Sequence, residues 1–346
     1  MDIKLNVLPS KTWNRLGMNE TFVSVENLAE DFSPAIEEHI DITVTRDYDF
    51  EENLLKGGLY NFFAPAKVTY IESKEGGKEN NPVLVKWDYS DGQKARSRVV
   101  LHAKQNSILS AIFVLNSNDL KGTDSLSAIS TELFADDNSQ INLYVANLLN
   151  SNAVCINDIR GICGKDAKIN LIKLELGSEE LYANTEINLD GERSDFTTDL
   201  GYYVKTDHIY DMNYVVNHRG VHTNCLMEIS GTLEENSKKV FRGTIDFKRG
   251  CKASVGTESE SVLLLGDEMI NQTLPVILCE EEDVEGNHGA SIGKLDDKVL
   301  FYLGARGFSP EEAQKMVTRS RIDSVCQKIP SEEIQAQIND FISERM

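Results

Sequence analysis

The side chains best suited to chemistry lie toward the C-terminal end of the chain, where one histidine stands among glycines. His288 occupies the stretch VEGNHGASIG, which runs from Val284 to Gly293. A neutral imidazole is a borderline ligand that suits iron, and it can release a proton as a metal arrives. The neighbours Asn287 and Gly289 keep bulk away from the ring. His288 is therefore a candidate metal ligand, and the alternative interpretation is a polar turn residue.

A second candidate lies shortly upstream. Cys279 ends the apolar run VILC and is followed by the four acids Glu280, Glu281, Glu282 and Asp283. Carboxylates bind hard cations, so this run is able to gather iron. A lone cysteine in an apolar strand is usually part of the core, and an acidic run is usually a solvated loop. Cys279 is thus the weaker of the two candidate metal ligands.

The cysteine pattern indicates free thiols. The chain has six cysteines, and none forms a CxxC pair or matches a zinc module. Cys155 and Cys163 flank INDIRGI and are interpreted as structural, and nothing in the sequence shows that Cys225 and Cys251 meet. The N-terminal stretch MDIKLNVLPSKTW has no apolar core of signal-peptide length. We expect a reduced, cytoplasmic protein.

Two further histidines, His218 and His222, flank RGV at positions i and i+4. On a helix this spacing would resemble a metal-binding pair, but the surroundings predict strand and turn, so we interpret the pair as structural. The sequence contains no HExxH, GxSxG or P-loop motif. Any ATP hydrolysis linked to this chain would therefore come from a partner.

Charge and length restrict the function further. The 346 residues carry a formal net charge of −21. Such a charge repels phosphate groups, which argues against nucleic acids and anionic membranes as partners. No apolar run reaches the roughly 20 residues of a membrane span.

Short apolar runs closed by Gly, Asn or Asp dominate residues 67–303 and predict a mainly β protein. INLYVANLL alternates with a strand period at Ile141, Leu143 and Val145. AKINLIKLELG alternates and then shifts phase, which predicts a bend or bulge between two strands. A sandwich, a barrel and a β-helix all fit this pattern. The scarcity of hairpin signals favours the stacked rungs of a β-helix.

The two ends differ from this body. Residues 1–66 form a mixed segment, with a helix expected over 24–40 and a strand over 40–50. In residues 306–346, Ser309, Pro310 and Glu312 predict a capped helix. Ser331 precedes a second helix, whose apolar stripe is Ile334, Ile338, Phe341 and Ile342. We therefore place the β-helix core at residues 67–305 and a helical segment after it.

From His218 to Asp323 the sequence resembles the SufB/SufD family of iron–sulfur cluster assembly proteins. The segments that carry the resemblance are HRGVHTNCLMEISGTLEENSKKVFRGTIDF, SVLLLGDEMINQTLPVILCEEEDVEGNHGASIG and LFYLGARGFSPEEAQKMV. The resemblance implies a right-handed parallel β-helix. It also implies work in a complex with the ABC-type ATPase SufC, in which SufB and SufD pair through their β-helices. A cluster or iron would be held transiently with a SufB partner, and no permanent cofactor is expected.

The departures from the family pattern point to SufD. SufB proteins carry an acceptor cysteine where this chain has Glu260, and a glutamate where it has Gly289. Many SufD proteins place a cysteine at the position of Gly286, and the FRG at residues 241–243 looks more like SufB. The resemblance is thus to a SufD-like, non-catalytic scaffold, with His288 as a ligand or iron-entry group at the SufB–SufD junction.

The resemblance places the ATPase contact on the C-terminal helices, with Met316, Val317, Ile334 and Phe341 as contact residues. We expect that the β-body cannot bury both apolar helix faces, because its rungs already stack on one another. The alternative is that the helices merely cap the open end of the β-helix.

Two other functions stay open at this point. One is a homodimeric, SufB-like cluster scaffold. The other is a cytoplasmic β-helix carbohydrate-active enzyme, which needs closely placed carboxylates, and Asp195, Asp199 and Asp207 are its candidates.

Overall fold

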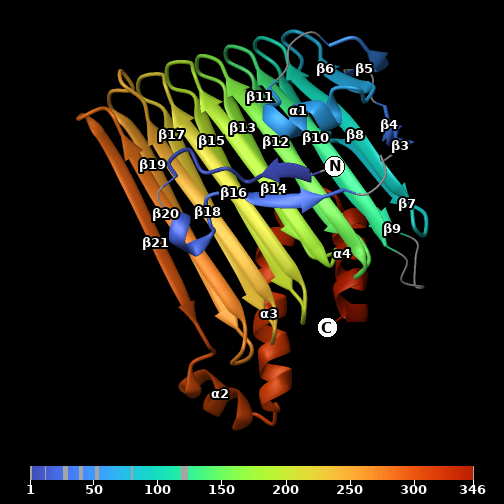
Figure 1. The fold of residues 1–346 in the computed structure, drawn as a ribbon, viewed down its shortest axis with the longest axis vertical. Helices are drawn as coiled ribbons and strands as arrows, with labels where there is room; N and C mark the ends of the chain where they lie inside the picture. Colours follow the sequence, from blue (N-terminus) through green and yellow to red (C-terminus); the bar gives the residue numbers. More distant parts are fainter. Residues whose placement is uncertain are drawn as a thin grey trace.

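Two stacked sheets form the body of the protein. The computed structural model describes residues 2–11, 13–25, 30–38, 42–50, 54–78, 81–117 and 124–345. Successive strands of the chain alternate between the two sheets, which we name the front sheet and the back sheet after the view in Figure 1. One front strand and the back strand that follows it make one rung.

The front sheet has this order of strands: β20 (Ile270–Cys279), β18 (Lys238–Phe247), β16 (Ile209–His218), β14 (Glu180–Leu189), β12 (Ala153–Cys163), β10 (Ser125–Ala135), β8 (Lys94–Ala103), β6 (Val68–Ser73) and β5 (Ile42–Tyr48), with β3 (Glu30–Asp31) beside β8. The back sheet has the order β21 (Val284–Gly293), β19 (Ser254–Leu264), β17 (Asn224–Leu233), β15 (Asp195–Val204), β13 (Lys168–Glu175), β11 (Gln140–Leu148), β9 (Ile108–Ser117), β7 (Val83–Tyr89) and β4 (Ala35–Glu37).

The rungs stack in parallel, which confirms the predicted parallel β-helix. From β6 to β21 each strand pairs in parallel with the next strand of its own sheet. Leu143 of β11, for example, lies beside Leu171 of β13 and Ala111 of β9. Alternate residues of each strand therefore point into one continuous apolar interior between the sheets.

The phase shift in AKINLIKLELG has a different origin from the predicted bend. β13 is one regular strand without a break in register. Ile169 and Leu171 point into the interior, whereas Leu174 and Leu176 belong to a second apolar cluster on the outer face of the back sheet. The apolar phase changes because this strand is buried on both faces, and the expectation of a bulge was wrong.

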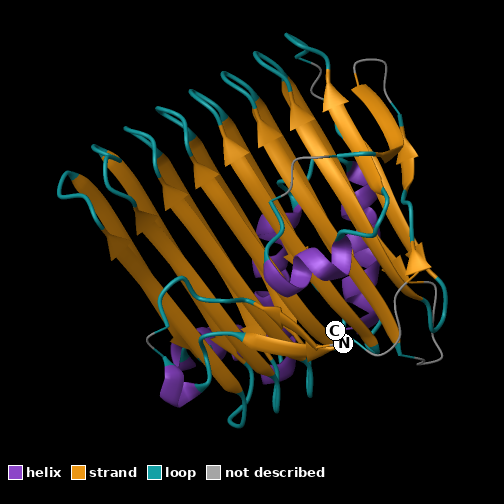
Figure 2. Cartoon of the chain, turned by 45° about the horizontal axis from the view of Figure 1, so that its top comes forward, coloured by secondary structure: helices purple, strands orange, loops and turns teal. Residues whose placement is uncertain are grey.

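The N-terminal part runs across the outer face of the front sheet (Figures 1 and 2). It contains β1 (Asp2–Leu5), a 3₁₀ turn (Asn14–Leu16), β2 (Thr21–Ser24) and α1 (Gly57–Phe63). The helix predicted over 24–40 is wrong where the structure describes it, because β2, β3 and β4 fall there; residues 26–29 and 39–40 lie outside the described residues. The strand predicted over 40–50 is confirmed as β5.

A buried ion pair holds this N-terminal part to the sheet. Arg242 of β18 and Asp211 of β16 bond at 2.5 Å, and Arg242 Nε also donates to the carbonyl of Met18 at 2.7 Å. Asn6 and Thr21 donate to Asp211 from the other side. The FRG segment therefore supplies an arginine that anchors the first residues of the chain to the rungs.

Three helices follow the last strand: α2 (Asp297–Gly304), α3 (Pro310–Cys326) and α4 (Glu332–Arg345). The capping box of Ser309 and Glu312 is confirmed, and α2 is a helix that the sequence pattern did not predict. The apolar stripe of α4 packs on the outer face of the back sheet together with Ile322 and Val325 of α3. The β-body thus does bury these apolar faces, contrary to the expectation. Among the described residues no helix is long and apolar enough to cross a membrane.

This packing predicts unequal effects of two substitutions in the helices. Ile338→Ala should lower the free energy of unfolding by about 2–4 kcal/mol, because Ile338 is fully buried and leaves a cavity. Met316→Ala should change it by about 0.5 kcal/mol or less, because Met316 is exposed. Urea unfolding followed by circular dichroism measures both. Similar values for the two variants would contradict the packing of α4 on the back sheet.

Candidate functional site

The last rung, formed by β20 and β21, is the open end of the solenoid. β20 pairs only with β18, and β21 only with β19, so no strand of the described part of the chain covers their other edges. Most of β21 is exposed, and Ile270 and Ile292 leave 53% and 46% of their area open. Unpaired backbone donors and acceptors thus stand next to apolar side chains at this end.

His288 lies on β21 with its side chain on the inner face of this open rung. It stands in register with Glu258 of β19, whose side chain is buried between the sheets. Because register neighbours on parallel strands project to the same face, His288 and Glu258 lie side by side, about 4.8 Å apart along the sheet. His288 is therefore part of a strand, and the interpretation as a turn residue is wrong.

Glu258 is a buried carboxyl group in an unusual position. Its carboxylate crosses the interior and lies directly over Gly243 of β18, where an added Cβ would fall 2.3 Å from Oε2. Glu258 has no hydrogen bond or ion pair with any residue that the structure describes, and it is 3% exposed. Burial, and then the nearby charge of Glu260, raise the pKa of Glu258 to about 8, while Lys239 acts in the opposite direction.

A closed hydrogen-bond network lies beside Glu258. Lys239 Nζ donates to Glu260 at 2.6 Å and to Thr273 at 2.9 Å. Thr273 and Tyr202 donate to the same carboxylate at 2.6 and 3.0 Å. Burial lowers the pKa of Lys239, and the contact with Glu260 opposes this shift. The position at which SufB proteins carry a cysteine is thus occupied here by one half of a buried ion pair.

The second predicted ligand is not brought to the first. Cys279 ends β20, is exposed, and donates to the carbonyl of Glu281 at 2.9 Å. On the last rung Cys279 is the register partner of Phe247. The register partner of Gly243, the residue that faces Glu258, is Pro275, so Cys279 lies four residues away from the site. Within the described ranges no three His, Cys, Asp or Glu side chains converge as a metal site. Cys279 stays a prediction without geometric support.

The residues interpreted as structural do lie in structural positions. Cys155 and Cys163 are buried free thiols in the main interior cluster. Cys225 and Cys251 are also buried there, and both are free thiols. His218 packs against Phe247, and burial lowers its pKa to about 4. His222 is a corner residue with a positive φ of 56°.

The carboxylates of the carbohydrate-enzyme hypothesis are scattered. Asp195 and Asp199 are four residues apart on β15, about 13 Å along the strand. Asp199 is ion-paired with Lys328, which follows α3, and Asp207 lies in the corner beyond the other end of β15. The two acids of a glycosidase lie about 5–9.5 Å apart, so these three do not form such a site.

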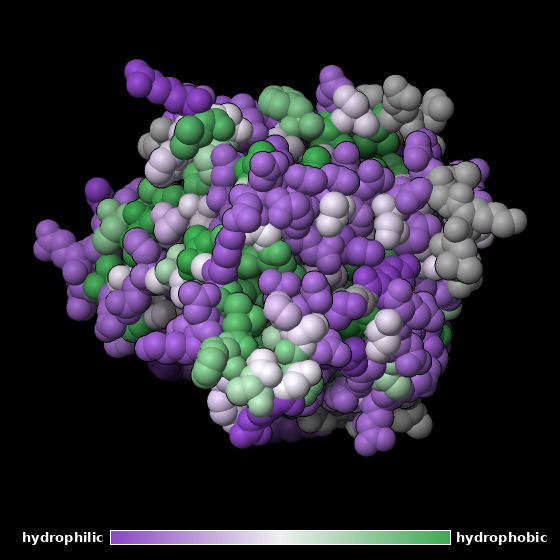
Figure 3. Space-filling view, turned by 90° about the horizontal axis from the view of Figure 1, so that it is seen from below, coloured by the Kyte–Doolittle hydropathy of each residue, from purple (hydrophilic) through white to green (hydrophobic). Residues whose placement is uncertain are grey.

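An apolar surface lies at the end of the molecule that carries α2. Its members are Val299, Phe301, Tyr302, Phe308 and Met316, and Phe301 is 80% exposed. Figure 3 views the molecule from this end and shows green apolar patches between hydrophilic side chains. We call these five residues the α2 patch.

The four predicted contact residues of the ATPase differ in exposure. Met316 belongs to the α2 patch, and Val317 is half-buried. Ile334 is fully buried and Phe341 packs beneath Arg345, so α4 turns its apolar face inward.

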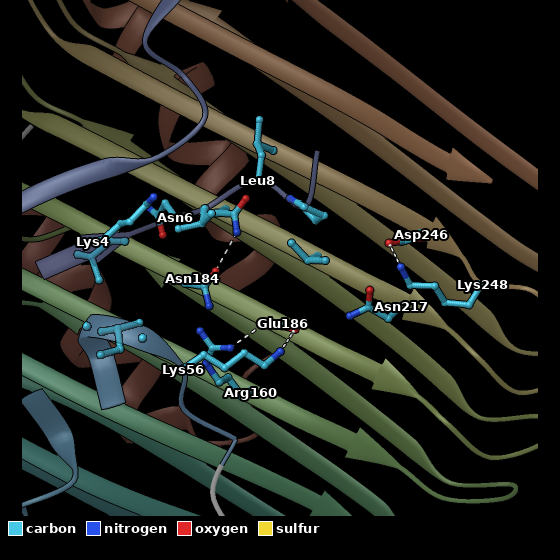
Figure 4. Close-up of a pocket in the computed structure, with 18 of the residues that line it drawn as sticks. Lys4, Asn6, Leu8, Lys56, Arg160, Asn184, Glu186, Asn217, Asp246 and Lys248 are labelled. Atoms are coloured by element: carbon cyan, nitrogen blue, oxygen red, sulfur yellow. Dashed lines mark hydrogen bonds and ion pairs between the residues drawn. The ribbon is translucent and has the colours of Figure 1, made fainter. Parts of the chain in front are cut away.

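A cavity of about 410 Å³ lies between the N-terminal part and the outer face of the front sheet. Glu186 lies between Lys56 and Arg160, and Lys248 lies against Asp246 (Figure 4). The ion pairs of Glu186 measure 2.8 Å to Lys56 and 2.5 Å to Arg160, and that of Lys248 with Asp246 measures 2.6 Å. Because these cations already have carboxylate partners, the cavity is a polar seam under the N-terminal part.

Comparison with known proteins agrees with this geometry. The model of the SUF system FeS cluster assembly SufBD core domain matches residues 88–321. The chain belongs to the SufBD family. It is 22% identical over 224 residues to the iron–sulfur cluster assembly protein SufD of Bacillus subtilis, covering 64% of this chain and 51% of that protein. It is 26% identical over 172 residues to SufD of Escherichia coli, covering 49% and 40% of the two chains.

A SufBD family protein of Staphylococcus saprophyticus is 27% identical over 115 residues, which cover 33% of this chain and 25% of that protein. The matches span about half or less of the length of these curated relatives. Within the family the chain is SufD-like.

Sequence reasoning missed Glu258 and Lys239. The acids in ESESV look like a solvated segment, and only the registers of β18, β19 and β21 place Glu258 inside, beside His288. The signal that was present is alternation: Glu258, Glu260 and Val262 share one strand face, so a buried Val262 implies buried acids.

The raised pKa of Glu258 predicts a pH-dependent difference in stability. Its folded pKa of about 8 exceeds the ordinary 4.5, so its contribution to stability is full below about pH 4.5 and is lost as the pH rises through 8. The variant Glu258→Gln should therefore gain stability over the wild type between pH 5 and pH 9, with an upper limit of roughly 5 kcal/mol. Urea unfolding at several pH values measures this gap, with exposed Glu285→Gln as control. A gap that does not change with pH would contradict the assignment.

Proposed function

We propose that this chain is a non-catalytic scaffold subunit of a SufBCD-type complex that assembles and transfers iron–sulfur clusters. It acts with a SufB-like scaffold and a SufC-like ABC-type ATPase, in the cytoplasm. The lack of a P-loop in the sequence agrees with ATP hydrolysis by a partner. Iron or a cluster is the cargo, held transiently between this chain and the SufB-like partner.

The unpaired edges of β20 and β21 carry this proposal. Both sheets end at the same rung, and no described strand pairs with its outer edges, so both can extend by pairing with strands of a second β-helix. Such pairing would place His288 at the junction of two interiors. Ile270 and Ile292 add apolar area to the same end. If the rungs of a second β-helix continue the stack, the strand edges of β20 and β21 are no longer exposed to solvent. The same contact covers the polar interior of the last rung.

The α2 patch supports the contact with the ATPase. Five apolar side chains are exposed on α2, the following turn and the first half of α3, whereas the apolar stripe of α4 is buried on the back sheet. Large exposed apolar side chains that lie close together in the fold mark a site of protein interaction. The proposed ATPase contact therefore keeps Met316, gains Phe301 and Tyr302, and leaves out Ile334.

A substitution within the α2 patch tests the ATPase contact. Phe301→Asp should abolish co-purification of the SufC-like protein of the same organism and leave the SufB-like protein bound, because a carboxylate cannot be buried in an apolar interface without a partner. Phe22→Asp is the matched control, since Phe22 is also exposed but lies on β2. Unchanged ATPase recovery with Phe301→Asp would refute this contact. Truncation at Gly307 is less clean, because it also uncovers the back sheet.

The site assignment predicts a defect for His288→Ala in the assembled complex. The variant should fold and bind both partners, because His288 is exposed and packs little, but it should lower bound iron or cluster yield several-fold. Iron content and the cluster absorption spectrum after reconstitution measure this. Wild-type rate and yield would exclude His288 as a ligand.

The network around Glu260 predicts that another subunit accepts sulfur. A thiolate is needed to take a persulfide sulfur, and Glu260 has none. Burial raises the pKa of the thiols of Cys155, Cys163 and Cys225, which keeps them protonated and unreactive. Mass spectrometry after incubation with a cysteine desulfurase should find persulfide chiefly on the SufB-like protein. Comparable persulfide on Cys279 or Cys251 would overturn this assignment.

A further inference from the structure

We propose that Glu258 is a second metal ligand of this chain, paired with His288 across the last two rungs, and that Gly243 keeps open the space that its carboxylate needs. The inference rests on the proposed function, since it takes iron as the cargo at the open rung. It adds that this chain alone offers a divalent cation two donors, a carboxylate oxygen and an imidazole nitrogen.

The first support is geometric. Glu258 and His288 are register partners on adjacent parallel strands and project to the same inner face. Among the described residues Glu258 and His288 form no ion pair within 4.0 Å, so their metal-binding atoms are not already engaged with each other. A metal that binds oxygen and nitrogen at about 2.0–2.2 Å fits between two neighbouring side chains of one face. Mixed carboxylate and imidazole ligation suits Fe²⁺.

The second support is that Glu258 has no structural partner among the described residues. Lys239 is the buried cation whose charge acts on Glu258, but its ammonium group is already bonded to Glu260 and Thr273. A carboxyl group that is 3% exposed and has no partner among the described residues destabilises the fold. A residue with a purely structural role would not be expected to carry this cost. A cation between Glu258 and His288 would supply the missing partner. The proton carried by Glu258 would then leave to solvent as the metal enters.

The third support comes from the opposite sheet. Gly243 has no positive φ, so its backbone does not require glycine. A methyl group there would lie 2.3–2.5 Å from all three carboxyl atoms of Glu258. Space rather than backbone conformation therefore explains this glycine, and the space is filled by the carboxylate. The next residue outward in register is Pro275, which brings no competing donor.

The open rung completes the site. Beyond His288 no described strand covers the interior, so a hydrated cation can enter from that end and keep water as its remaining ligands. Glu260, the other inward acid of β19, is held by Lys239, Thr273 and Tyr202 and is not free to move to the metal. Among the residues that the structure describes, the ligand set is thus limited to Glu258 and His288.

Anaerobic calorimetric titration of the purified full chain with Fe²⁺, repeated with Co²⁺ followed by visible absorption, tests the proposal. We expect one site in the wild type and at least a tenfold loss of affinity in both Glu258→Gln and His288→Ala. Gly243→Ala should lose affinity to a similar degree although it removes no donor. Glu285→Gln, an exposed acid of β21, should bind as the wild type does. Thermal unfolding of each variant establishes that it is folded.

Two results would overturn the proposal. One is wild-type affinity in Glu258→Gln. The other is no binding to the wild-type chain at 1 mM metal, a concentration that detects any site with a binding free energy of roughly −4 kcal/mol or stronger. Neither would refute the proposed function, which fails if the SufB-like protein does not pair with the edges of β20 and β21 in the assembled complex. If Gly243→Ala is unfolded, Glu258→Asp replaces it. The shortened carboxylate of Glu258→Asp should lower the metal affinity less than Glu258→Gln does. Equal losses of affinity in the two variants would count against Glu258 as a ligand.

Discussion

Each strand of the solenoid takes its backbone hydrogen bonds from the strands of the neighbouring rungs, and this constraint leaves the end rungs incomplete. At the N-terminal end the chain deals with it locally, because β5 and β4 pair antiparallel with β6 and β7. At the other end β20 and β21 have no such cover among the described residues, since the chain leaves β21 for α2 instead. Exposed strand edges are a liability that proteins normally cover, so an uncovered pair at one end indicates a partner.

The interior next to this edge is polar, whereas most of the interior further back is apolar. Lys239 and Glu260 are fully buried and paired, and removing one partner of such a pair costs about 3–5 kcal/mol. Ion pairs of this kind give little net stability over apolar residues of the same size. A similar buried pair, Lys173 with Glu175, lies on β13 in the middle of the solenoid, so such pairs are not confined to the end rungs. Glu258 extends the polar interior to the surface at His288.

The body of the fold was predictable from sequence because its signal is local. Alternation in INLYVANLL is confirmed by the burial of Ile141, Leu143 and Val145, and the capping box at Ser309 by α3. The errors arose where burial on a second face changed the pattern. Leu174 and Leu176 shifted the apolar phase because helices cover β13, and the stripe of α4 looked unpartnered because the outer face of the back sheet was not foreseen. The segment 24–40 has a helix-like composition, but its described residues pair as short strands with the edges of β1, β7 and β8.

The candidate site was only half accessible to sequence reasoning. His288 stood out through its glycine neighbours and the family pattern, whereas its relation to Glu258 depends on a register between residues thirty positions apart. Periodicity cannot fix such a register, since corner lengths vary from rung to rung.

The central claim is that the last rung is a junction with a second β-helix. A cryo-electron microscopy structure of the complex co-purified with the SufB-like and SufC-like proteins tests it most directly. The account predicts that β20 and β21 continue into strands of the SufB-like protein, with His288 enclosed at the seam. A complex in which both edges remain exposed to solvent, and the SufB-like protein binds elsewhere, would contradict it.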